Sequence, residues 1–141
     1  MNPSPPPEIS VLIPAYNEIG TIAQIIDMVA TSLSGVRKEI VIVDDGSKDG
    51  TRDWLSNRYK TTPEQDFIKL RESSVTAISD ECDIRIVFHS SNKGKGGAIQ
   101  TAMRAATGAV LIIQDADLEY DPGDWTEMYR VASFQPDYLQ M

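Results

Sequence analysis

The sequence of 141 residues is poor in the side chains that build sulfur- or histidine-based sites, with one cysteine, Cys82, and one histidine, His89. A structural zinc site takes four cysteine and histidine ligands, so this sequence alone cannot form one. A disulfide within the chain is excluded because it needs two cysteines. A single cysteine is typical of a reducing compartment, and we interpret the protein as cytoplasmic. We expect the lone His89 to be structural or to lie at the rim of a site.

Positive charge is also scarce, since 13 Lys and Arg stand against 21 Asp and Glu and give a net charge of −8. Nucleic-acid binding needs a basic face, so a nucleic-acid partner is not expected. No apolar run reaches the ~18 residues needed to span a bilayer. The first residues, MNPSPPPE, have neither the basic nor the apolar part of a signal peptide. We therefore expect no transmembrane segment, and a disordered, proline-rich leader over residues 1–8.

What the sequence does contain is four short apolar runs rich in Ile and Val. Each run is nearly continuous and is bounded by polar or turn-forming residues, which is typical of strands buried on both faces of a parallel sheet. The predicted strands cover residues 9–14, 39–45, 84–89 and 109–115.

The segments between these runs predict helices. Helices are expected over about 18–33, 50–59 and 95–107, and the first and third show residues of one face at helical spacing. Gly108 is the expected C-cap of the third, and Asp121–Pro122 predicts the start of a last helix over about 122–134. The alternation predicts an α/β fold with a doubly wound, mostly parallel sheet and helices on both faces. Residues 60–83 break the pattern and are expected to be a surface insertion, with a short helix near 64–72.

Polar stretches follow all four predicted strands. In sheets of this kind ligands bind beyond the carboxyl ends of the strands, and these ends meet at one edge. The sequence therefore predicts a single site at this edge. The stretches are Pro14–Glu18, Asp44–Ser47, Asn92–Gly97 and an acidic row of Asp115, Asp117, Glu119 and Asp121.

The acidic row has an acid at every second position, so in an extended segment these side chains lie on one side and repel one another. One interpretation is a polar turn before the helix that begins at Pro122. The other is a divalent-metal site, because carboxylates without nitrogen or sulfur neighbours suit Mg²⁺ or Mn²⁺. Two carboxylates and a substrate pyrophosphate would then complete the metal's shell.

The other three stretches also have two interpretations each. The first is a helix start with Asn17 as N-cap, or a wall in which Tyr16 stacks on a base. Asp44 and Asp45 either cap free amides or accept hydrogen bonds from a nucleobase or ribose. Residues 92–97 are a tight connection with solvated lysines, which we favour for this stretch alone, or a turn that approaches a phosphate. They match neither the Walker A loop nor the Gly-x-Gly-x-x-Gly pattern.

Taken together, the stretches resemble glycosyltransferase family 2, which has a GT-A fold. They read VLIPAYNE, EIVIVDDGSKDGT and NKGKGGAIQTAMRAATGAVLIIQDADLEYDP. The form QDADLEYDP is most similar to dolichyl- or polyprenyl-phosphate mannosyl- and glucosyltransferases. The resemblance covers about residues 9–134 apart from 60–83. Family members continue further, so it implies a GT-A domain truncated after the DxD motif, with its nucleotide-sugar-binding half at residues 9–141.

The resemblance also implies roles for individual residues. Asp45, with Asp44, would hold the base, and Lys95 would border the donor. Asp115–Ala116–Asp117 would be the DxD motif. No residue is assigned as catalytic. The implied nucleotide-sugar-binding residues are Pro14, Ala15, Tyr16, Glu18, Asp44, Asp45, Lys95, Asp115 and Ala116, and the implied ligands of Mg²⁺ or Mn²⁺ are Asp115, Asp117 and Glu119.

The resemblance implies metal-dependent, inverting transfer of a hexose from GDP-mannose or UDP-glucose to a polyprenyl or dolichyl phosphate. A lipid-phosphate acceptor implies a peripheral position at the cytoplasmic membrane face. One alternative is a non-catalytic nucleotide-sugar-binding half-domain that needs a partner chain. A weaker one is a nucleotidyltransferase, whose glycine- and arginine-rich phosphate loop is missing after the first strand. Absent further strands would leave a sheet edge exposed, through which a second copy could associate.

Overall fold

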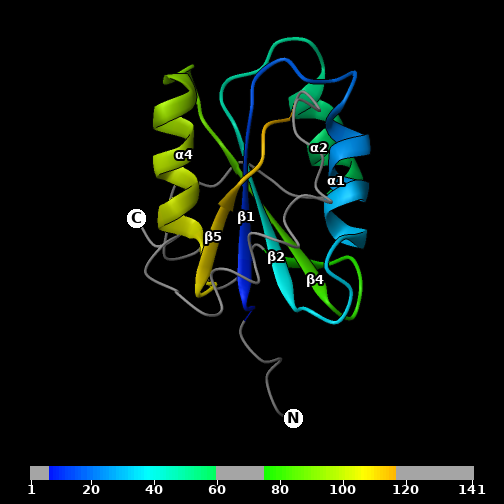
Figure 1. The fold of residues 1–141 in the computed structure, drawn as a ribbon. Coiled ribbons are helices and arrows are strands. Elements are labelled where there is room, and N and C mark those ends of the chain that lie inside the picture. Colours follow the sequence, from blue (N-terminus) through cyan, green and yellow to red (C-terminus); the bar gives the residue numbers. More distant parts are fainter. Residues whose placement is uncertain (1–6, 60–74, 117–141) are drawn as a thin grey trace.

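The structure is a computed structural model that describes residues 7–59 and 75–116. These residues form one sheet covered by helices on both faces, and Figure 1 shows α4 on one side and α1 and α2 on the other. The elements, in chain order, are β1 (Ile9–Ala15), α1 (Ile22–Thr31), β2 (Lys38–Asp44), α2 (Thr51–Tyr59), β3 (Val75–Ala77), β4 (Cys82–Phe88), α4 (Gly94–Ala105) and β5 (Val110–Ile113).

The strand order in the sheet is β3-β4-β2-β1-β5. The four predicted strands are mutually parallel, with β1 paired to β2 and β5, and β2 paired to β4. Their carboxyl ends therefore meet at one edge, the upper edge in Figure 1. The predicted α/β architecture is confirmed, and each strand matches its prediction to within a few residues.

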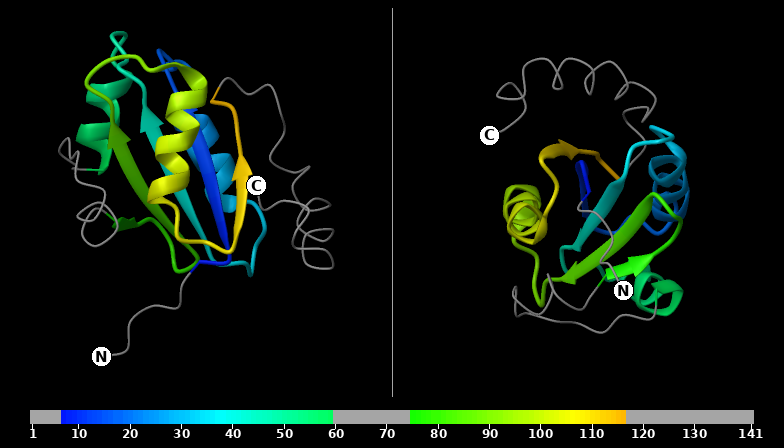
Figure 2. Two further views of the ribbon diagram at one scale, coloured as in Figure 1. Left: turned by 90° about the vertical axis from the view of Figure 1, so that its left-hand side faces the viewer. Right: turned by 90° about the horizontal axis from the view of Figure 1, so that it is seen from below.

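Both faces of β1, β2 and β4 are buried, which explains why their sequences read as nearly continuous apolar runs. Successive side chains of a strand point to opposite faces. Thus Val11 and Ile13 of β1 pack in the cluster with α1, while Leu12 packs with Ala98 and Ala102 of α4. Small residues on α4 let this helix lie close to the sheet. The two views in Figure 2 show the same three layers from the side and from below.

The amino edge of the sheet contains a buried polar network around Glu39. The Glu39 carboxylate accepts hydrogen bonds from the Ser10 hydroxyl at 2.6 Å and from the Thr107 N–H at 2.5 Å. The Arg85 guanidinium lies 4.0 Å from it and donates to the Ala105 carbonyl, at the end of α4, at 2.6 Å. These contacts fasten the end of α4 to the strands beneath it. They lie at the amino edge of the sheet, whereas the predicted site lies at the carboxyl edge.

Two local predictions are corrected. Part of the expected insertion 60–83 belongs to the sheet, because β3 pairs antiparallel with β4. Gly108 is not a helix C-cap, since α4 ends at Ala105 and an extended Ala106 follows it. A Cβ at Gly108 would instead lie 2.6 Å from Ser10 Oγ and 2.7 Å from its backbone nitrogen, so glycine is required by close packing on β1. The helices predicted near 64–72 and 122–134 fall outside the described residues.

No helix in residues 7–59 and 75–116 is long and apolar enough to cross a membrane. Within this part of the chain, β5 pairs with β1 alone, and the predicted association of two copies through an exposed edge stays a prediction.

Candidate functional site

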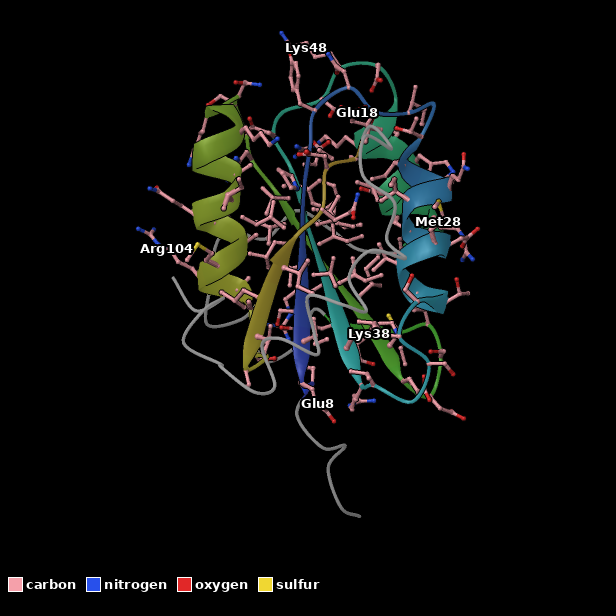
Figure 3. All side chains as sticks on the ribbon, in the orientation of Figure 1. Glu8, Glu18, Met28, Lys38, Lys48 and Arg104 are labelled. Carbon is pink, nitrogen blue, oxygen red and sulfur yellow. The ribbon has the colours of Figure 1, made fainter. Side chains whose placement is uncertain are left out.

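A pocket of about 310 Å³ opens at the carboxyl edge of the sheet. It is formed by the end of β1, by the segments that follow β1, β2, β4 and β5, and by the first two turns of α4. In Figure 3 the labelled Glu18 and Lys48 lie at this edge, while Glu8 lies at the opposite one. All the predicted donor-binding residues except Asp44 line the pocket. The lining residues are Pro14, Ala15, Tyr16, Glu18, Asp45, Asn92, Gly94, Lys95, Ala98, Asp115 and Ala116.

The loop after β1 is tied to the loop after β2. The N–H of Asn17 donates to Ser47 Oγ at 2.9 Å, and Asn17 Oδ1 accepts from the N–H of Lys48 at 2.8 Å. The N–H of Glu18 donates to Thr51 Oγ1 at 2.9 Å. Asn17 therefore links the two loops, and its backbone is in the left-handed conformation with φ 54°. It is not the N-cap of α1, because this helix begins only at Ile22. These bonds hold the backbone that directly follows Tyr16 in the pocket wall.

Asp49 strengthens the same junction. Its carboxylate accepts from the Ile19 N–H at 3.2 Å and from the N–H and hydroxyl of Thr51 at 3.0 and 2.6 Å. Desolvation alone would raise the pKa of Asp49, but the hydrogen bonds from Thr51 and Ile19 outweigh it and lower the pKa below its usual value. The ionised form thus stabilises the start of α2 and the loop that precedes α1.

The adjacent acids Asp44 and Asp45 have different surroundings. Asp44 is fully buried and does not line the pocket. Its Oδ2 accepts from the Ser47 N–H at 3.2 Å and lies 3.6 Å from the Arg52 guanidinium. Asp45 is 3% exposed and lines the pocket. Asp44 therefore holds the turn that carries Asp45, and its predicted contact with a base stays a prediction.

Asp45 is held by one of its two oxygens. Oδ1 accepts from the Lys93 N–H at 2.8 Å and lies 2.8 Å from Nδ1 of His89. No contact within the described residues engages Oδ2, which leaves it as the acceptor for a molecule in the pocket. His89 was expected to be structural or at the rim, and it is buried. Its link to Asp45 joins residues 44 positions apart, which no local sequence pattern signals.

The other side of the pocket brings Asp115 next to Lys95. The Lys95 ammonium forms an ion pair with the Asp115 carboxylate, whose side chain is 14% exposed. The next carbonyl, that of Ala116, accepts a hydrogen bond from the Thr21 hydroxyl at 2.5 Å. This bond fixes the end of the β5 segment to the residue that precedes α1. Thr21 was not predicted as part of the site.

The start of α4 also faces the pocket, through Gly94, Lys95 and Ala98. The first N–H groups of a helix have no partner within the helix and attract anions. Gly94 opens this helix with φ 85°, a conformation that favours glycine, and its N–H donates to Asn92 Oδ1 at 3.0 Å. The stretch 92–97 is thus a helix start at the pocket.

Only one of the three predicted metal ligands belongs to the residues that the structure describes. Asp115 lies in the described part of the chain, whereas Asp117 and Glu119 lie outside it. Among the described residues, no three His, Cys, Asp or Glu side chains are grouped to hold a metal ion.

Solved structures define the class of protein to which this fold belongs. The mannosyltransferase PcManGT from Pyrobaculum calidifontis, in complex with GDP-Man and Mn²⁺, is similar with a TM-score of 0.58 and 30% identity, over 79% of this chain and 28% of that chain. S. aureus TarS 1-349 is similar with a TM-score of 0.62 and 18% identity, over 90% of this chain and 32% of that chain. The fold is that of GT-A glycosyltransferases.

The family follows from the sequence comparison. The model of the family described as Glycosyl transferase family 2 matches residues 10–140, and the chain belongs to this family. The fold and the family predicted from the sequence are therefore confirmed, and the nucleotidyltransferase alternative is not supported.

Curated relatives include a dolichol-phosphate mannosyltransferase from Pyrococcus furiosus, 28% identical over 82% of this chain and 27% of that protein. A dolichyl-phosphate beta-glucosyltransferase from Saccharomyces cerevisiae is 35% identical over 77% of this chain and 29% of that protein. The chain thus spans less than a third of the length of these relatives.

Proposed function

We propose that this chain provides the donor site of a glycosyltransferase that transfers a hexose from a nucleoside diphosphate sugar. The observation that carries the proposal is the placement of Asp45 and Asp115 in one pocket. Asp45 follows β2 and Asp115 follows β5, and β1 lies between these strands. Neighbouring strands are about 4.8 Å apart, so the two carboxylates enter the pocket roughly 10 Å from each other along the edge. An elongated ligand with a base at one end and a diphosphate at the other fits this spacing.

Asp45 would bind the base. Its Oδ2 is a carboxylate acceptor, and the imide or amide N–H of uracil or guanine is a matching donor. Tyr16 lines the same pocket with a partly exposed ring, which is suited to packing against a base or ribose. Both residues are held by the bonds between the loops after β1, β2 and β4. The base would therefore bind to a wall that is already in place.

The diphosphate would bind on the side of Asp115 and α4. The start of α4 offers backbone N–H groups, and Lys95 offers a positive charge at the same place. The oxygen ligands Asp115, Asp117 and Glu119 would hold Mg²⁺ or Mn²⁺. The surroundings of Asp115 are suited to a cation, because its carboxylate already forms an ion pair with the ammonium of Lys95. A bound metal would neutralise the charge that develops on the leaving diphosphate.

The acceptor is proposed from the two curated relatives, which are a dolichol-phosphate mannosyltransferase and a dolichyl-phosphate beta-glucosyltransferase. A phosphate acceptor is already an anion, so a general base is not required for its attack. Attack from the face opposite the departing diphosphate inverts the anomeric configuration. A lipid-linked acceptor would place the protein at the cytoplasmic membrane face.

Calorimetric titration of the purified chain tests the donor site. GDP, UDP, GDP-mannose and UDP-glucose are each titrated with Mn²⁺, with Mg²⁺ and with EDTA. We expect metal-dependent binding of at least one nucleotide. A folded chain that binds none of them would contradict the proposal. Hexose transfer is then assayed separately with a polyprenyl phosphate, because a chain that binds without turnover would match the half-domain alternative.

Three variants locate the contacts. Asp45→Asn is expected to weaken nucleotide binding by about 10- to 100-fold, since hydrogen bonds to charged groups contribute about 1.5–3 kcal/mol, with inorganic pyrophosphate unaffected. Asp115→Asn is expected to remove the dependence on metal. Asp27→Asn is the matched control, because Asp27 is an exposed acid on α1 that does not line the pocket. If Asp45→Asn weakens pyrophosphate as much as nucleotide, Asp45 does not bind the base.

A further inference from the structure

A chain of three buried side chains, Thr101, His89 and Asp45, runs from α4 to the pocket. Nε2 of His89 lies 2.8 Å from Thr101 Oγ1, and Nδ1 lies 2.8 Å from Asp45 Oδ1. Their exposed fractions are 8%, 5% and 3%. The three residues come from α4 and from the ends of β4 and β2. The network joins α4 to the ends of two strands, and it ends on the carboxylate proposed to bind the base.

The protons of this network can be assigned from hydrogen-bonding rules. An ionised carboxylate only accepts, so the proton between His89 and Asp45 must reside on Nδ1. The Thr101 hydroxyl has one hydrogen and two neighbours, Nε2 of His89 and the Gly97 carbonyl at 3.1 Å. Either the ring is neutral and Thr101 donates to Nε2, or the ring is protonated and Thr101 donates to Gly97. In both cases Nδ1–H points at Asp45 Oδ1.

The consequence is that Oδ1 of Asp45 has no acceptor capacity left. A carboxylate oxygen has about two lone-pair sites, and here the Lys93 N–H and His89 Nδ1–H occupy both. Oδ2 alone faces a ligand. Guanine presents two adjacent donors, N1–H and N2–H, which pair best with both oxygens of a carboxylate. Uracil presents a single donor, N3–H, which needs one oxygen.

We propose that His89 and Thr101 are positioning residues that make Asp45 a single acceptor and thereby select uracil over guanine. The inference rests on the proposed function and names the donor class as UDP-sugars. Arg52 supports the arrangement from the outside, because it donates to the His89 carbonyl at 3.0 Å and its guanidinium lies over the Phe88 ring at 4.9 Å. The imidazole is thus fixed at its backbone and at both ring nitrogens.

The ratio of GDP to UDP dissociation constants, measured by calorimetry with Mn²⁺, tests the proposal. We expect the full chain to bind UDP about tenfold or more tightly than GDP, which corresponds to one hydrogen bond. His89→Leu releases Oδ1 and is expected to reduce this ratio toward one. His89→Asn, whose side-chain amide can donate in place of Nδ1, is expected to retain most of it. Thr101→Val is expected to lower the ratio, with Thr101→Ser as the matched control.

A spectroscopic measurement tests the proton assignment independently. His89 is the only histidine of the chain, so the imidazole ¹⁵N spectrum contains one residue and needs no assignment. We expect a protonated Nδ1 throughout. A ring protonated at Nε2 alone would overturn the proposal, and it can be observed in the unmodified chain even if a His89 variant fails to fold.

Nucleotide binding distinguishes a failure of the donor site from a failure of the selection of uracil. Binding of nucleotides with a ratio that favours GDP, or with a ratio that His89→Leu leaves unchanged, overturns the selection of uracil and leaves the donor site standing. Absence of binding to every nucleotide overturns the donor site and the selection together.

Discussion

Gly46 offers the sharpest test of how the pocket is built, because its backbone touches a second loop. It has φ +80°, and a Cβ at this position would lie 2.9 Å from the backbone nitrogen of Asn92 and 3.1 Å from the carbonyl carbon of Ser91. Backbone atoms cannot rotate away as a side chain can. In Gly46→Ala the loop after β4 must therefore move away from the loop after β2. That movement pulls the Lys93 N–H from Asp45, with which it makes a 2.8 Å hydrogen bond.

The expected loss in the free energy of unfolding has two parts, and a control variant can separate them. A residue with a side chain in the left-handed region costs about 1–2 kcal/mol, and forced overpacking costs about 1–3 kcal/mol more. Gly46→Ala incurs both. Gly35→Ala is the matched control, because Gly35 has φ +87° with no atom within 4 Å of its Cβ position and incurs only the first. The difference between the two variants, about 1–3 kcal/mol, measures the contact between the loops.

Urea denaturation gives the free energies of unfolding, and calorimetric titration with UDP and GDP gives the effect on binding. We expect Gly46→Ala to be less stable than Gly35→Ala and to lose most of its nucleotide affinity, while Gly35→Ala binds normally. Equal stability of the two variants, with equal binding, would refute the close approach of the two loops and with it the account of how Asp45 is held.

Three further predictions concern other parts of the molecule. Glu39→Gln leaves the buried guanidinium of Arg85 without its carboxylate, and urea denaturation should show a loss of about 3 kcal/mol, whereas a loss within error would show that this pair does not stabilise the fold. Burial raises the pKa of the Cys82 thiol from 9.0 to about 11, so the folded chain keeps a proton that the unfolded chain releases, and stability should fall as pH rises from 9 toward 11. The same thiol should react with a thiol reagent at pH 8 only after unfolding, and fast reaction of the folded chain would contradict this. Lys95→Gln removes the ammonium that pairs with Asp115. Mn²⁺ titrated alone should then bind more tightly and UDP more weakly. A change of both affinities in the same direction would contradict a shared site.

The fold could be predicted because β1, β2 and β4 are buried on two faces, and the sequence alone carries that signal. Residues such as Val11, Leu12 and Ile13 are apolar in succession since one face packs on α1 and the other on α4. Parallel strands then place all the polar ends at one edge, which located the pocket. β3 was missed because a strand of three residues is too short to show any periodicity. Gly108 was misinterpreted because its neighbour Ser10 lies 98 positions away in the sequence.

Most of the residues that line the pocket could be named from the sequence, but the contacts between them could not. Successive residues at the end of a strand point in opposite directions, so only one of Asp44 and Asp45 could face the pocket, and the sequence does not say which. His89 and Thr21 contact their partners through hydrogen bonds that cross 44 and 95 positions. A single histidine or threonine has no pattern from which such a bond could be inferred, because it depends on the register of strands and the placement of a loop.

The pocket has two sides, one at Asp45 and one at Asp115. They differ in which existing contacts a ligand would have to break. On the side of Asp45, the bonds from Lys93 and His89 already fix the carboxylate. A base would therefore meet one acceptor oxygen, Oδ2, that needs no rearrangement, and little ordering entropy would oppose its binding. On the side of Asp115, the ion pair with Lys95 occupies the carboxylate that a metal would need. If Asp115 holds Mg²⁺ or Mn²⁺ as proposed, the cation would compete with the ammonium of Lys95, which could then contact the diphosphate. Metal and diphosphate are therefore expected to bind cooperatively, while the base contributes nearly the same affinity with or without the metal. Titration of uridine, UDP and Mn²⁺ in pairs would separate these contributions, and a uridine affinity that depends strongly on Mn²⁺ would show that the two sides are not independent.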